Sequence, residues 1–116
     1  MLTIEKLRAF GANVDEGVAR CMNNEGFYLR MVNMAIDDRG SFEKLYAAAE
    51  ADDRKACFEA AHALKGMLGN VALTPLFEPA SELTELLRAD RDADCRAYSG
   101  TIRELHEKLL ALRDEA

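Results

Sequence analysis

Cations, histidines and cysteines are all scarce in this sequence of 116 residues. Lys plus Arg number 15 against 21 Asp plus Glu, which gives a net charge of -6 at pH 7. Without an excess of cations to replace the counterions of phosphate, the composition argues against a sequence-independent nucleic-acid-binding protein, although a small local basic patch stays open. Only two histidines occur, His62 and His106. A multi-histidine metal site is therefore nearly excluded, and any histidine chemistry must use one of these two positions.

The cysteines, the apolar runs and the strand signals are equally sparse. Cys21, Cys57 and Cys95 are odd in number, far apart and without a CxxC pair, which argues against a disulfide framework and a zinc site. Cys57 and Cys95 fall on apolar stripes, so we expect buried free thiols. No apolar run approaches the roughly 18 residues of a membrane span, and Glu5 and Lys6 interrupt the place of a signal peptide. We expect a cytoplasmic protein with no membrane contact.

Ala, Leu, Glu, Lys and Arg dominate the chain, and alternating β-branched runs are missing, which favours helix almost throughout. Apolar residues recur at steps of three and four, as is typical of helices in a bundle. The clearest stripes are Cys57, Ala61, Leu64, Leu68 and Val71; Leu76, Ala80, Leu83 and Leu87; and Cys95, Tyr98, Ile102, Leu105, Leu109 and Leu112. Earlier stripes are Tyr28, Met31, Val32 and Ala35, and Phe42, Leu45 and Ala49.

These stripes predict an all-α protein, an antiparallel four-helix bundle with short additional N-terminal helices. We expect residues 1–116 to form one domain, with the bundle core over about 27–113 and an N-terminal helical cap over 3–22. The predicted helix starts are Thr3, Ser41 and Asp53 as N-caps, and Thr74 as an N-cap before Pro75. Pro79 lies about one turn into the next helix and predicts a bend there.

The segment around His62 is the part of the sequence that indicates chemistry. His62 is one position off the core stripe, so it faces outward, and Lys65 and Gly66 follow one turn later with Gly69 after two turns. Glycine inside a helix costs about 1 kcal/mol relative to alanine, so two of them need a reason. We interpret them as clearing access to the imidazole, which can act as a nucleophile toward activated phosphorus. Lys65 supplies a cation for an anion such as phosphate.

An ordinary interpretation stays open beside this one. A lone helical histidine is often just a surface residue, and small residues also let a neighbouring helix approach closely. His106 is the internal comparison, because Leu109 and Leu110 follow it where His62 has Lys65 and Gly66. We expect His106 to be a solvated or semi-buried helix residue without chemistry.

The run Ala61-His62-Ala63-Leu64-Lys65-Gly66, continued by Gly69-Asn70-Val71, resembles the signature of histidine-containing phosphotransfer (Hpt) domains. Asp53 stands where that family has an acidic helix start. Three positions depart from the pattern: Ala72 replaces a frequent glycine, Met67 replaces a small residue, and Pro79 is unusual. The resemblance implies a four-helix bundle that relays a phosphoryl group between aspartates of receiver domains in a two-component phosphorelay.

By this resemblance His62 is the phosphorylated nucleophile, and Lys65 neutralises part of the phosphoryl charge. The expected partners are response-regulator receiver domains, including those of a hybrid sensor kinase, and the protein itself is expected to be a monomer. It is expected to need no cofactor and no metal of its own, with Mg²⁺ on the receiver. Since no nucleotide-binding loop is present, we expect a phosphoryl carrier and not an autonomous ATP-dependent kinase.

The predicted docking face surrounds His62 with Gly66, Gly69, Phe58, Lys55 and Met67. Phe58 lies one turn before His62 and is either part of this face or the edge of the core. Two other functions stay open. The bundle could bind receivers as an adaptor or scaffold without carrying phosphate, an alternative that gives His62 no role. It could also be a plain structural subunit, which leaves the helix glycines unexplained.

Overall fold

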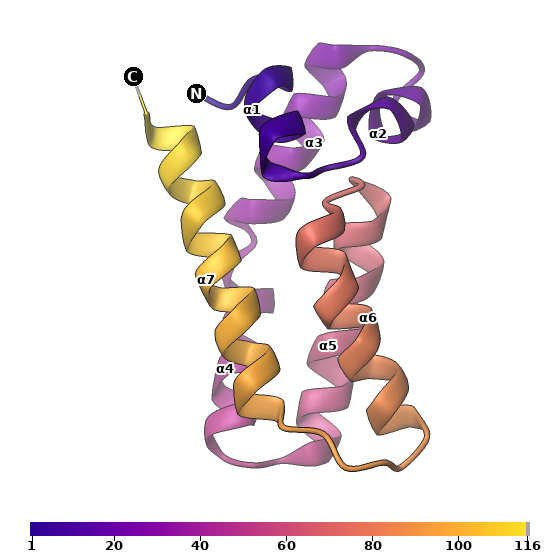
Figure 1. Cartoon of the computed structure of the whole chain (residues 1–116), viewed down its shortest axis with the longest axis vertical. Helices are drawn as coiled ribbons and strands as arrows, with labels where there is room; N and C mark the ends of the chain where they lie inside the picture. Colours follow the sequence, from indigo (N-terminus) through magenta and orange to yellow (C-terminus); the bar gives the residue numbers. More distant parts are fainter. Residues whose placement is uncertain (116) are drawn as a thin grey trace.

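The computed structural model describes residues 1–115, which form seven helices and no strand (Figure 1). The all-α prediction is therefore confirmed. In chain order the helices are α1 (Ile4–Phe10), α2 (Val14–Arg20), α3 (Glu25–Asp37), α4 (Arg39–Glu50), α5 (Arg54–Asn70), α6 (Thr74–Arg88) and α7 (Cys95–Asp114).

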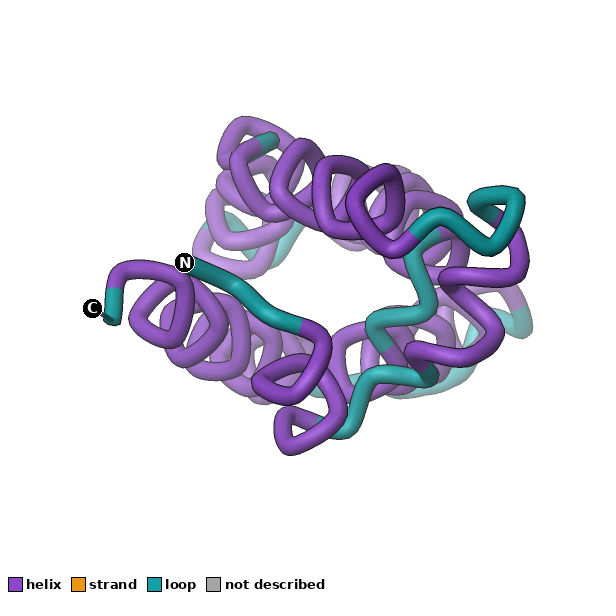
Figure 2. The backbone as a smooth tube through the Cα atoms, turned by 90° about the horizontal axis from the view of Figure 1, so that it is seen from above, coloured by secondary structure: helices purple, strands orange, loops and turns teal. Residues whose placement is uncertain are grey.

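Helices α4, α5, α6 and α7 form the bundle. Each contacts the next along the chain, and α7 returns to α4, so the four enclose a common core (Figure 2). Helix α3 continues the line of α4 toward one end of the molecule, and α1 and α2 lie at that same end (Figure 1). The expected bundle with additional N-terminal helices is thus present. None of the helices in residues 1–115 has the length and apolar character needed to cross a membrane.

The buried face of α7 differs from the stripe expected from the sequence. Its buried residues are Cys95, Ser99, Ile102, His106 and Leu109, whereas Tyr98, Leu105 and Leu112 are partly exposed. The stripe expected from the sequence did not include Ser99 and His106, because these two buried positions carry polar residues. The expectation that His106 is solvated or semi-buried is therefore wrong, since its exposure is 5%.

His106 has a structural role at the break between α3 and α4. Its ring stacks on Phe42 with the centroids 3.7 Å apart, and Nε2 donates to the Ile36 carbonyl at 2.8 Å. That carbonyl belongs to the last turn of α3, where backbone acceptors have no partner within the helix. Burial is the main cause that lowers the pKa of His106 below its ordinary value. The imidazole thus acts as a neutral donor inside the core.

The predicted helix starts have mixed outcomes. Thr3 and Asp53 cap α1 and α5 as expected, each accepting a backbone N–H three residues later. Ser41 is not a cap, because α4 begins two residues earlier and the Ser41 hydroxyl donates to Asp38. Thr74 is the first residue of α6 and not its cap.

Helix α6 runs through Pro79 without interruption. Cys57 and Cys95 are buried free thiols, as expected.

Candidate functional site

Helix α5 places His62 on the outside of the bundle. Asp53 starts the helix, and its buried face consists of Cys57, Ala60, Ala61, Leu64 and Leu68. This face anchors α5 against α4 and α6. His62 follows Ala61 by one residue, about 100° around the helix, and its side chain is exposed. The register of the core stripe therefore fixes which way the imidazole points.

Two side chains orient the His62 ring. Phe58, one turn earlier and half-buried, stacks on the imidazole at a centroid distance of 5.8 Å and an interplanar angle of 14°. Arg88 at the end of α6 places Nη2 3.5 Å from His62 Nδ1, and its guanidinium carbon lies 5.3 Å from the centre of the Phe58 ring. Because Nδ1 faces Arg88, Nε2 is the ring nitrogen that a partner can approach.

A bridge of charges joins α5 to α6 beside the imidazole. Lys65 Nζ lies 2.9 Å from Glu85 Oε1, and Arg88 Nε lies 3.4 Å from Glu85 Oε2. The hydrogen bond from Lys65 is the largest cause that lowers the pKa of the Glu85 carboxyl. One carboxylate therefore pairs with a cation from each helix beside His62, and of the two cations Arg88 is the more exposed.

The two helix glycines differ in their surroundings. A Cβ on Gly66 would meet nothing within 4 Å, so this glycine leaves an open surface one turn from His62. A Cβ on Gly69 would lie 3.0 and 3.1 Å from two carbons of the Phe77 ring. The interpretation of Gly69 as a residue that clears access needs correction, because it lets α6 pack its phenylalanine closely against α5.

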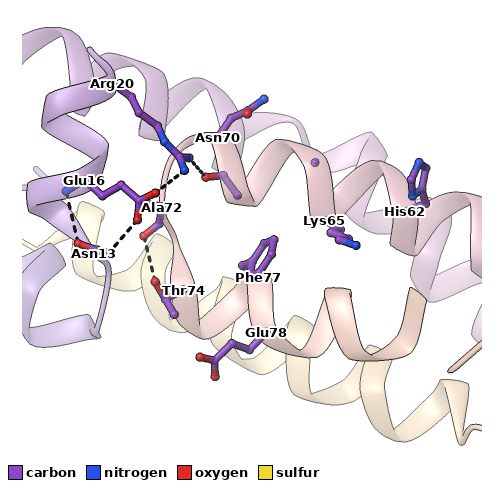
Figure 3. Close-up of a pocket in the computed structure, with 12 residues that line it drawn as sticks. Asn13, Glu16, Arg20, His62, Lys65, Asn70, Ala72, Thr74, Phe77 and Glu78 are labelled. Atoms are coloured by element: carbon purple, nitrogen blue, oxygen red, sulfur yellow. Dashed lines mark hydrogen bonds and ion pairs between the residues drawn. The ribbon is translucent and has the colours of Figure 1, made fainter. Parts of the chain in front are cut away.

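A hollow of about 630 Å³ extends from His62 along α5 (Figure 3). Its lining includes His62, Lys65, Gly66 and Gly69 from α5, Phe77 and Glu78 from α6, and Asn13, Glu16 and Arg20 from the N-terminal part. Of the other predicted docking residues, Phe58 contacts His62 outside this hollow. Lys55 is exposed on α5 and does not line the hollow, and Met67 packs against the core.

Arg88, Glu85, Phe77 and Arg20 are site residues that the sequence reasoning missed. The first two had a usable signal. In an antiparallel pair of helices, a step backward along one helix is matched by a step forward along the other. Lys65 on α5 pairs with the acidic Glu85 on α6. His62 lies three residues before Lys65, and Arg88 lies three residues after Glu85, so these two residues also lie side by side. Arg20 had no such signal, because its approach depends on how α2 folds over the bundle end.

An accessible imidazole beside two cations, on the outside of a helical bundle, defines a protein module that can hold an anionic group on histidine. The family model described as "Hpt domain" matches residues 33–115, and the chain belongs to this family. Hpt domains are phosphocarrier modules of two-component systems, distinct from kinases, and they interact with receiver domains. No curated protein and no solved structure matched the chain. Within residues 1–115 no three His, Cys, Asp or Glu side chains group as metal ligands.

Proposed function

We propose that His62 relays a phosphoryl group between the aspartates of two receiver domains. The Nε2 lone pair attacks the phosphorus of an aspartyl phosphate in line, an N–P bond forms, and the P–O bond to the aspartate breaks. The aspartate leaves as a carboxylate, and the ring proton stays on Nδ1 during the attack. Transfer to the second receiver is the reverse reaction with another carboxylate. The single observation that carries this proposal is the exposed His62 between Lys65 and Arg88 in a chain of this family.

The two cations have distinct parts in this proposal. Phosphoryl transfer depends mainly on positioning and on neutralising the charge of the phosphoryl oxygens. After the phosphoryl group is bound to Nε2, Lys65 turns from Glu85 toward the phosphoryl oxygens. Arg88 leaves Nδ1, which must carry the proton while Nε2 attacks, and its guanidinium then binds a phosphoryl oxygen. Phe58 supports the ring from the side through its stacking contact.

The docking face is centred on Gly66. Gly66 carries no side chain and has open space at its Cβ position, which lets the receiver bring its aspartate close to the imidazole. Lys55, two turns before His62 on the same helix, adds a cation at the margin of this face, and Met67 lies at its edge near the core. We propose that Mg²⁺ enters the complex with the receiver and that this chain supplies no cofactor.

Transfer from a phosphorylated receiver in the presence of Mg²⁺ tests the proposal. The chain should become labelled, and the label should be acid-labile and base-stable, as expected for a phosphoramidate. His62→Gln should abolish labelling. His106→Gln is the matched control, because the amide of glutamine can still donate to the Ile36 carbonyl. Labelling that survives His62→Gln would contradict the assignment of the nucleophile. Receiver affinity that survives His62→Ala, with no transfer to the wild type, would instead favour the adaptor.

A further inference from the structure

The N-terminal part of the chain is hydrogen-bonded to the end of α5 and to the turn between α5 and α6. The backbone N–H of Asn13 donates to the Ala72 carbonyl at 2.9 Å, and the Tyr28 hydroxyl donates to the Val71 carbonyl at 2.8 Å. Arg20 on α2 donates to the Gly69 carbonyl, the last turn of the helix that carries His62. Three separate contacts therefore hold α2 and the start of α3 against the end of α5. Residues 1–32 lie outside the segment that matches the family model.

Helix α2 forms one wall of the hollow that begins at His62. Figure 3 shows Asn13, Glu16 and Arg20 at one end and His62 at the other, with Phe77 between them. The half-buried Phe77 ring gives the hollow an apolar part, and charged side chains surround it. An apolar recess within a polar rim suits a single apolar side chain of a protein partner.

The dimensions place this wall within reach of a partner bound at His62. Gly69, which Arg20 contacts, is seven residues from His62, about 10 Å along the helix. A protein interface of standard size buries about 800 Å² on each partner, equivalent to a disc of about 16 Å radius. A partner centred on the imidazole that extends toward the turn therefore covers both the hollow and α2.

We propose that the receiver-docking face continues from His62 across the hollow onto α2. The receiver places an apolar side chain against Phe77, and the Glu16–Arg20 ion pair on α2 meets the receiver surface beside it. Helix α2 thus contributes to the choice of receiver, although it lies outside the part of the chain that matches the family. This inference rests on the proposed function, because it assigns the receiver as the occupant.

Point variants test this better than deletion, since removing α1 and α2 would uncover the buried Leu7, Phe10 and Val14. Glu16→Lys changes the charge of the wall, and Glu78→Trp fills the hollow from its exposed rim. The controls are Glu104→Lys and Glu104→Trp, at an exposed position on α7 away from the hollow. The probes are receiver domains of the source organism charged with acetyl phosphate and Mg²⁺, with phosphoramidate as a small donor that needs no docking.

Each wall variant should raise the KM for the receiver about tenfold, equivalent to about 1.4 kcal/mol, with little change in the rate at saturation. The Glu104 variants should transfer like the wild type. Labelling by phosphoramidate reports whether His62 stays reactive in each variant. An unchanged KM in both wall variants, with a wild type that accepts phosphate, would overturn the inference alone. If no receiver labels the wild type, the proposed function fails and the inference fails with it.

A second measurement needs no variant. On addition of the transferring receiver to the isotope-labelled chain, backbone amide NMR signals of α2 should shift together with those around Gly66. Shifts confined to α5 and α6, or shifts of α2 on self-association without the receiver, would contradict a receiver-docking role for α2.

Discussion

Replacing Gly66 by alanine should make the protein more stable and less able to accept phosphate from a receiver. The added methyl group meets nothing within 4 Å, so the folded state gains helix propensity without a steric penalty. Alanine is favoured over glycine by about 1 kcal/mol inside a helix, which corresponds to roughly 4 °C in Tm for a domain of this size. The same methyl group stands on the surface where the receiver approaches His62, so transfer should become slower at low receiver concentration.

Gly69→Ala provides the comparison for this experiment. It brings the same gain in helix propensity, but its methyl group lies 3.0 Å from the Phe77 ring. The ring must move by a few tenths of an ångström, and the cost of this movement offsets the gain. Gly69→Ala should therefore be less stable than Gly66→Ala.

Urea unfolding followed by circular dichroism and receiver-dependent labelling of His62 check the two halves of this prediction. If Gly66→Ala gains no stability over the wild type, the open surroundings assigned to Gly66 are wrong. If the variant is more stable but accepts phosphate at the wild-type rate at every receiver concentration, Gly66 has no role in docking.

Three further predictions concern charge, pH and metal. Glu85→Gln should free Lys65 and Arg88 for the phosphoryl group, so phosphohistidine made with phosphoramidate should hydrolyse more slowly than in the control Glu82→Gln; equal lifetimes would contradict this. Because burial lowers the pKa of His106 from about 6.5 in the unfolded chain, its contribution to stability is present above pH 6.5 and is lost as the pH falls below it. Between about pH 7.5 and 5.5 the urea midpoint should therefore fall more in the wild type than in His106→Gln, and parallel curves would contradict this. Chelation of Mg²⁺ should stop labelling by a receiver but leave labelling by phosphoramidate intact, unless this chain itself needs the metal.

The sequence was sufficient where local pattern decides the structure. The buried stripe of α5 fixes both the helix and the outward direction of His62, because one rotation around a helix relates them. It was insufficient where a second helix decides. Whether a missing Cβ faces solvent, as at Gly66, or a ring, as at Gly69, depends on the packing of α6. The burial of His106 was missed because the expected stripe was built from apolar residues alone. Its spacing of four residues from Ile102 and three from Leu109 is nevertheless the spacing of a buried helix face.

The length of the turn between α5 and α6 limits which sequence changes this chain can accept during evolution. The Lys65–Glu85 and His62–Arg88 contacts both depend on the register set by residues 71–73, where Ala72 adopts a positive φ of 53°. A substitution in this turn alters one side chain at a time. An insertion or deletion of one residue would rotate α6 relative to α5 and separate both pairs at once. We therefore expect the turn to tolerate changes of residue type far better than changes of length.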